Sequence, residues 1–168
     1  GADFLDGGDG ADNIFGGAGD DLLTGGVGND SLRGDDGNDE LQGGIGADLL
    51  VGGAGIDTIH AGDGNDVVYA GQDNDTVYGG AGDDNLRGEA GDDLIFGGLG
   101  SDAILAGAGA DLAHGEDGDD RIYAEGGDDQ IYGGIGNDLV RGQDGSDLGF
   151  GGAGNDLLIG DAGIDTLY

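Results

Sequence analysis

Residues 16–33 read GGAGDDLLTGGVGNDSLR, which is one nine-residue pattern written twice. Each half has glycine at its first, second and fourth positions, aspartate at its sixth and leucine at its eighth. The pattern extends in both directions without an insertion: residues 7–168 divide into eighteen copies, and residues 1–6 match the last six positions of an earlier one. An unbroken repeat of this kind indicates a repetitive architecture for the whole chain.

Four positions of the repeat are nearly fixed. The sixth is aspartate in all nineteen copies, the first is always glycine or alanine, and the fourth is glycine except at Asp73. The eighth is leucine, isoleucine or valine except at Ala113 and Gly149. Recurrent glycines mark positive φ angles or close backbone approach. Alternation along a strand turns the eighth side chain to one side, so we expect these residues to form a buried column.

These positions predict a turn of about six residues followed by a strand of about three in every copy. A strand so short is not stable alone, so the copies must stack on one another. A disordered low-complexity tract is the alternative for a chain rich in glycine and aspartate. The regular aliphatic eighth position argues against disorder, because a flexible linker has no need of an apolar residue at a fixed interval.

The composition limits the classes of partner. The chain has 168 residues, 46 glycines, 37 acidic residues, four arginines and a net charge of -33, which we interpret as one domain, residues 1–168, of a longer protein. Nucleic acid is excluded because it needs a basic face, and no apolar run is long enough for membrane insertion. Without cysteine there are no disulfides or thiolate metal sites. Cations are the expected partners.

The repeat resembles the pattern G-G-x-G-x-D-x-U-x of the RTX (repeats-in-toxin) calcium-binding family, and the resemblance covers the entire chain. It implies an all-β fold, a right-handed parallel β-roll solenoid with two nonapeptides, or eighteen residues, per coil. At that length the chain would form about nine coils.

The resemblance also implies the ligands. Each Ca²⁺ would lie between turns of adjacent coils, so that Asp12 would pair with Asp30, for example. The implied carboxylate ligands are Asp3, Asp12, Asp21, Asp30, Asp39, Asp48, Asp57, Asp66, Asp75, Asp84, Asp93, Asp102, Asp111, Asp120, Asp129, Asp138, Asp147, Asp156 and Asp165. Backbone carbonyls of the turns would complete the shell, such as those of Gly7, Gly8, Gly10, Gly16, Gly17, Gly19, Gly25, Gly26 and Gly28.

The spacing of the aspartates indicates a bound divalent cation independently of the resemblance. Carboxylates stacked about 4.8 Å apart would repel one another unless an ion lay between them. Oxygen ligands alone favour Ca²⁺ over Mg²⁺. The last two of the nineteen aspartates have no partner one coil further on, so the pairs predict about 15 to 17 ions. Their charge would nearly balance the formal charge of -33.

The seventh and ninth positions should face outward. The ninth holds Phe15, Tyr69, Tyr78, Phe96, Tyr123, Tyr132, Phe150 and Tyr168, and the seventh holds Leu22, Leu49, Leu94, Leu112, Leu139, Leu148 and Leu157. One interpretation is cross-strand packing that stiffens the sheet. The other is an apolar surface for lateral self-association or a partner.

A longer period of 54 residues relates Arg33, Arg87 and Arg141, and also His60 and His114. It suggests super-repeats at 7–60, 61–114 and 115–168, with matching residues on one face, although duplication alone would give the same pattern. The arginines could reach toward the acidic turns or cap the aromatic column. The histidines are too far apart to share one metal ion, so we expect them to be surface residues.

We expect a calcium-dependent folding module of a secreted or cell-surface bacterial protein, extracellular and exported by type I secretion as RTX proteins are. It would be an adhesin stalk or the repeat block of a toxin or exoenzyme. The alternatives are a self-associating surface-layer or filament module, and a non-catalytic repeat region attached to a secreted enzyme. Catalysis is not expected, because no histidine adjoins Ser31, Ser101 or Ser146 in the repeat and no irregular loop is present.

The copy AGQDNDTVY, residues 70–78, has Asp73 where the other copies have glycine. Aspartate is among the few residues that tolerate a positive φ. We therefore expect the turn to survive with some strain and the Asp73 side chain to face water. A calcium site that uses the Asp73 carbonyl should be the one that is weakened or reshaped.

Overall fold

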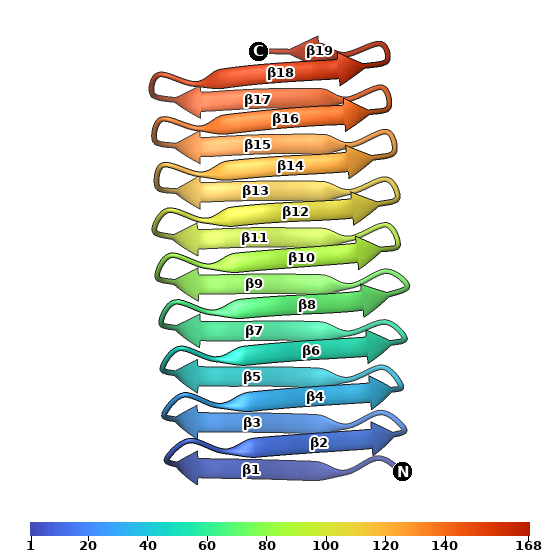
Figure 1. The fold of residues 1–168 in the computed structure, drawn as a ribbon, viewed down its shortest axis with the longest axis vertical. Coiled ribbons are helices and arrows are strands. Elements are labelled where there is room, and N and C mark those ends of the chain that lie inside the picture. The colour runs from blue at the N-terminus through green and yellow to red at the C-terminus, as the bar shows by residue number, and fades with distance from the viewer.

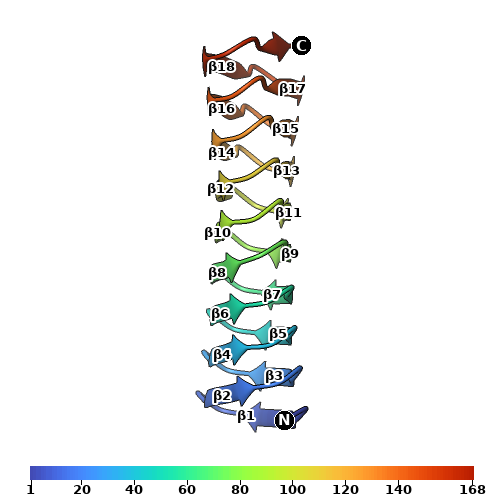
Figure 2. The same ribbon diagram turned by 90° about the vertical axis from the view of Figure 1, so that its right-hand side faces the viewer.

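The chain winds into a solenoid of two facing parallel sheets, as the computed structural model of residues 1–168 shows (Figure 1). Successive strands alternate between the sheets, and Figure 2 shows odd-numbered strands on one side and even-numbered strands on the other. The ten-stranded sheet contains β1 (Phe4–Asp9), β3 (Leu22–Val27), β5 (Glu40–Ile45), β7 (Thr58–Asp63), β9 (Thr76–Ala81), β11 (Leu94–Leu99), β13 (Leu112–Asp117), β15 (Gln130–Ile135), β17 (Leu148–Ala153) and β19 (Thr166–Leu167). The nine-stranded sheet contains β2 (Asn13–Ala18), β4 (Ser31–Asp36), β6 (Leu49–Ala54), β8 (Val67–Gln72), β10 (Asn85–Ala90), β12 (Ala103–Ala108), β14 (Arg121–Gly126), β16 (Leu139–Asp144) and β18 (Leu157–Ala162).

The pairing register of the strands follows the repeat, because each residue lies beside the residue two copies further on. Leu5 of β1 pairs with Leu23 of β3, and Ile14 of β2 pairs with Leu32 of β4, eighteen residues further on in each case. The expected all-β solenoid with two nonapeptides per coil and about nine coils is therefore confirmed. The structure contains no helix that could span a membrane.

The core is a double column of eighth-position side chains between the sheets. Leu23, Leu32, Leu41 and Leu50 are completely buried, and the column continues through both sheets to Val140. The exception Ala113 still lies in this core. A core only one side chain deep from each sheet buries little apolar surface for its length, so the remaining stability must come from the backbone ladders and the turns.

The expected division into a turn of six and a strand of three was wrong. The full-length strands have six residues, positions seven to nine of one copy and one to three of the next, and the turn is confined to positions four to six. The reason is that the second and third positions also pair between coils, as Gly26 does with Gly44 and Val27 with Ile45. Glycine at these positions extends the ladder instead of ending it.

Positive φ angles occur at the second and fourth positions, whereas the first-position glycines are not in this region. The fourth-position exception Asp73 has a φ of 73°, so the turn survives as expected. The sequence interpretation missed the six further non-glycine residues with positive φ, all at second positions: Asp35, Glu89, Glu116, Glu125, Gln143 and Asp161. All remaining second positions hold glycine. This could have identified the six, because a position that is otherwise always glycine often requires a positive φ.

The outward columns differ between the two sheets. On the ten-stranded sheet, ninth-position rings form one uninterrupted stack, with centroids 4.5 to 5.2 Å apart, through His60, Tyr78, Phe96, His114, Tyr132, Phe150 and Tyr168. All four arginines lie on the nine-stranded sheet, on β4, β10, β14 and β16. Cross-strand packing of the rings is thus confirmed, and the two faces have different chemistry.

The arginines contact both kinds of group that were expected, with one difference. Arg87 lies over the Tyr69 ring at 5.2 Å from its centroid, which is a cation–π contact. Arg33 pairs with Asp35 and Arg141 pairs with Asp161. Both acidic partners are second-position residues on the sheet face, and neither belongs to the turn aspartates. The division into 54-residue super-repeats stays a prediction.

Candidate metal centre

The sixth-position aspartates form a hydrogen-bonded column along each edge of the solenoid. The backbone N–H of Asp21 donates to Oδ1 of Asp39 at 2.8 Å, and that of Asp39 donates in the same way to Asp57. This contact links all the predicted pairs one coil apart, from Asp3 with Asp21 to Asp147 with Asp165. The register that the sequence predicted for these aspartates is therefore present.

The second carboxylate oxygen, Oδ2, has no hydrogen-bond partner although it is buried. This holds for Asp12, Asp21, Asp30, Asp39, Asp48, Asp57, Asp66, Asp75, Asp84, Asp93, Asp102, Asp111, Asp120, Asp129, Asp138 and Asp147. From Asp21 to Asp147 the whole residue is at most 3% exposed. A buried ionised oxygen without a partner is costly, so this column of oxygens requires either protons or cations.

Each Oδ2 faces a small space beside a first-position residue. A Cβ atom added to Gly25 would lie 2.6 Å from Oδ2 of Asp30 and 2.6 Å from the carbonyl oxygen of Gly43. Gly16 is in the same position relative to Asp21 and the carbonyl of Gly34. One carboxylate oxygen and one carbonyl oxygen of the next coil therefore converge on the same point, which explains why the first position takes only glycine or alanine.

Four first positions hold alanine, and all four are completely buried: Ala61, Ala70, Ala106 and Ala124. By the repeat register their methyl groups occupy the space beside Asp66, Asp75, Asp111 and Asp129, which follow them by five residues. The oxygens of these four aspartates therefore have an apolar neighbour that the other copies lack.

Burial raises the pKa of the column aspartates from Asp39 to Asp147, because the protein interior disfavours the charged form. It raises the pKa of Asp57 to about 6, of Asp111 to about 7 and of Asp75 to about 8. The hydrogen bond from the neighbouring coil opposes the shift, and repulsion from adjacent carboxylates adds to it. Both of these highest values belong to aspartates that follow a first-position alanine, but the pKa of Asp66 and Asp129, which also follow one, is raised only to about 6, so the methyl group is not the sole cause.

Carbonyl oxygens supply the other possible ligands. No group of three or more His, Cys, Asp or Glu side chains lies close enough together to hold a metal ion. The carbonyl oxygens of Gly8 and Gly10, however, point along the solenoid toward Gly26 and Gly28, where an added Cβ would lie 2.2 and 1.9 Å from them. An ion at these turns would therefore take most of its ligands from the backbone.

Asp73 keeps the turn carbonyl in place, although its φ of 73° lies below the 115° to 155° of the fourth-position glycines. Its carbonyl oxygen would lie 2.0 Å from a Cβ added to Gly91, within the range that the other fourth-position carbonyls show. The side chain is exposed, as expected. Its charge nevertheless contributes to the raised pKa of both Asp57 and Asp75. Asp73 therefore alters the backbone angle and the electrostatics of its turn and leaves the carbonyl oxygen in position.

A second ladder at the fifth position was not anticipated from the sequence. Oδ1 of Asn38 accepts a hydrogen bond from the backbone N–H of Ile56 at 2.8 Å, and Asp83 accepts one from Ser101 at 2.8 Å. These side chains reach toward the C-terminal coil, whereas the sixth-position carboxylates reach toward the N-terminal one. The many Asn and Asp residues at the fifth position were the signal, since both readily bond to nearby backbone N–H groups.

The donor set fits calcium. Unpartnered carboxylate oxygens and converging carbonyl oxygens are the hard ligands that Ca²⁺ prefers, and no nitrogen or sulfur ligand lies among them. The role of each predicted aspartate and glycine as a ligand stays a prediction. The structure shows that Oδ2 of a sixth-position aspartate and a first-position carbonyl oxygen of the next coil lie beside the same first-position residue.

The family model of the RTX calcium-binding nonapeptide repeat matches the chain over all of its length. The matched segments are residues 1–32, 15–50, 24–59, 42–77, 51–86, 71–104, 78–113, 105–140, 114–149 and 141–168. A comparison with individually characterised proteins gives no match.

Proposed function

The chain belongs to the RTX calcium-binding nonapeptide repeat family, and on this premise we propose that it is a module that folds when calcium binds its turns. The observation that supports this most directly is the column of buried Oδ2 atoms without partners. In the folded state these oxygens need a cation, and in the unfolded state water solvates them. Ions that bind only the folded state stabilise it by mass action.

The number of ions follows from the coil register. Each pair of sixth-position aspartates one coil apart, such as Asp57 and Asp75, lies beside one gap between the turns of adjacent coils. One ion in every such gap would require about 15 to 17 Ca²⁺. That load would offset nearly all of the net charge of -33, so self-repulsion would no longer oppose the compact state.

We place the module outside a bacterial cell, on a secreted or cell-surface protein. An unfolded chain whose charges repel one another is suited to passage through a narrow export channel such as that of type I secretion. Extracellular calcium at about millimolar concentration then permits folding. The straight, unbranched solenoid suits an adhesin stalk or the repeat block of a toxin or exoenzyme (Figure 1). It would be a non-catalytic region in either case, including one attached to a secreted enzyme.

A second candidate is a structural module that assembles laterally in a surface layer or filament. The observation that favours it is the uneven distribution of outward residues, with the stacked rings on one sheet and the arginines on the other. Both candidates need the same calcium-loaded fold.

Circular dichroism of the chain during a calcium titration tests the proposal. We expect little strand signal in excess chelator, a cooperative rise with Ca²⁺, and no equivalent rise with Mg²⁺ at the same concentration. Strand content that is complete in chelator would contradict it. Isothermal titration calorimetry on the same sample gives the number of ions, with about one ion per pair expected.

A further inference from the structure

The face of the ten-stranded sheet combines a ridge with a trough. The ridge is the stack of rings from His60 to Tyr168. The trough is the adjoining strip of second-position glycines, which leaves the backbone uncovered from Gly8 to Gly152 except at Glu116. Because the rings stack on one another, their edges and not their faces point outward, so the ridge is narrow. Its edge is wholly apolar at Phe96 and Phe150, and the His and Tyr members add ring nitrogens and hydroxyls.

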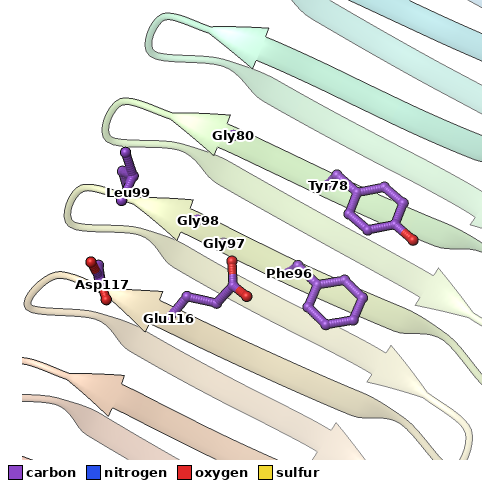
Figure 3. A pocket seen from close by; sticks show the side chains of 8 residues that line it. All are labelled: Tyr78, Gly80, Phe96, Gly97, Gly98, Leu99, Glu116 and Asp117. Carbon is purple, nitrogen blue, oxygen red and sulfur yellow. The ribbon is translucent and has the colours of Figure 1, made fainter.

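One part of the trough is a hollow of about 400 Å³ between Tyr78 and Phe96 on one side and Leu99 and Asp117 on the other. Figure 3 shows the two rings, the glycines of β9 and β11, and Glu116 extending its carboxylate toward Phe96. Third-position side chains border the trough on its far side. The large apolar ones on this sheet are 50 to 61% exposed: Val27, Ile45, Leu99 and Ile135.

The opposite face lacks these features. Its ninth positions include Arg33, Arg87 and Arg141, and its second positions include five polar or acidic residues that cover the backbone. Two of the arginines pair with acidic second-position residues. The nine-stranded sheet thus mixes charged groups with apolar ones such as Phe15, Val51 and Leu105 and carries no continuous ring stack. The ten-stranded sheet exposes a continuous column of rings beside a glycine strip.

We propose that two calcium-loaded copies of this chain pair through their ten-stranded sheets, with the solenoids parallel and the ridge of each copy in the trough of the other. A two-fold axis parallel to the solenoid produces this fit, because it places each strand opposite the same strand of the second copy. The ring edge of Phe96 then lies over Gly98 of the second copy.

The same symmetry pairs the one charged residue of the trough. Glu116 and the ridge residue His114 belong to the same strand, β13, so each His114 meets the Glu116 of the second copy. The remaining acidic residues of this face that flank the trough, such as Asp63 and Asp117, are exposed at its outer edge, where water can solvate them. Both the shape and the charge of the face are therefore self-complementary.

The area suits a pair that dissociates on dilution. The stacked rings run over seven strands about 4.8 Å apart, and six residues of about 3.3 Å each set the width, so the ridged part of the face covers roughly 650 Å². Specific interfaces bury about 600 to 1,000 Å² on each partner. The inference rests on the proposed calcium-loaded fold, since the face exists only when the coils are stacked.

Sedimentation velocity of the calcium-loaded chain over a concentration series tests the pairing. We expect a species of twice the 16.3 kDa chain mass that dissociates on dilution. Circular dichroism of each sample reports folding separately, so a chain that does not fold contradicts the proposed function, and a folded chain that does not pair contradicts only this inference. A folded monomer up to about 1 mM, or growth beyond two copies, overturns the pairing.

Two matched substitutions locate the interface. Gly98→Glu places a carboxylate in the trough, and we expect it to weaken pairing at least about tenfold. Gly71→Glu changes the same repeat position on the nine-stranded sheet and should leave pairing unchanged; like Gly98, Gly71 pairs with one glycine and one glutamate. The chain already holds Glu116, Glu89 and Glu125 at this position, so both variants should fold. Phe96→Gln with its control Leu105→Gln gives a second test that adds no charge. Equal effects of a variant and its control overturn the assignment of the face.

Discussion

Oδ1 of Asp75 accepts a hydrogen bond from the backbone N–H of Asp57, 2.8 Å away, while Oδ2 of the same carboxylate is buried without a partner. The first contact fixes the stacking of two coils. The second leaves half of the carboxylate available to a cation or a proton. This division of one side chain between a structural and a ligand role is repeated along both edges of the solenoid.

We expect the metal-free fold to lose stability as the pH rises. The pKa of Asp57, Asp111 and Asp75 is raised from 3.8 to about 6, 7 and 8 in the folded chain, so the folded state binds protons more tightly than the unfolded one. The resulting stability is complete below about pH 4 and is lost as the pH rises through about 6 to 8. Circular dichroism in chelator should show more strand at pH 5 than at pH 8, and the reverse order would contradict this.

Calcium binding should have the opposite pH dependence. Ca²⁺ needs the ionised carboxylate, so each bound ion must displace the protons that burial favours. Calorimetry should show weaker binding, together with proton release, at pH 6 than at pH 8. A calcium affinity that is the same at both values would show that the raised pKa values do not belong to ligand groups.

Asp75→Asn should weaken calcium binding without removing the stacking contact. The amide oxygen can still accept the N–H of Asp57, but the charge and one strong ligand are lost. We expect the calcium midpoint of folding to rise about two- to tenfold. The control is Asp83→Asn, which removes a charge from an exposed fifth-position carboxylate that bonds the N–H of Ser101. A shift of equal size in both variants would indicate a general charge effect instead of a site.

Ala70→Gly should tighten the site at Asp75. Removal of the methyl group opens the space beside Oδ2 and reduces the desolvation that raises the pKa of Asp75. Glycine also makes the unfolded chain more flexible, so the matched control is Ala103→Gly at an outward seventh position. We expect a lower calcium midpoint for Ala70→Gly than for Ala103→Gly, and the opposite order would refute the role of the methyl group.

Asp73→Gly should stabilise the calcium-loaded fold. The substitution relieves a positive φ of 73° in a non-glycine residue, worth about 1 kcal/mol, and removes a charge near Asp57 and Asp75. Thermal unfolding in saturating calcium measures the gain. Asp73→Asn separates the two causes, because it removes the charge and keeps the strain. A lower melting temperature for Asp73→Gly would mean that the Asp73 side chain contributes to the site.

The repeat and the family resemblance together predicted most of the fold. A fixed interval of nine residues with an aliphatic eighth position can bury that position only if the copies stack. The resemblance added that two nonapeptides form one coil, which pairs Asp57 with Asp75. The buried sixth-position aspartates pair at the same interval of eighteen residues as the eighth-position side chains. Local sequence was less informative about where strands end, because a glycine such as Gly26 looks like a turn residue whether or not its neighbours pair.

Other features depend on which coils and faces come together. The direction of the two carboxylate oxygens of Asp75 depends on the backbone of the adjacent coil, which no single copy of the repeat contains. The separation of His114 from Arg87 onto opposite faces follows from the alternation of copies between two sheets. The repeat and the family resemblance therefore predicted the register, because burial acts on every copy alike. The chemistry of each face emerged only when residues eighteen positions apart were stacked into columns.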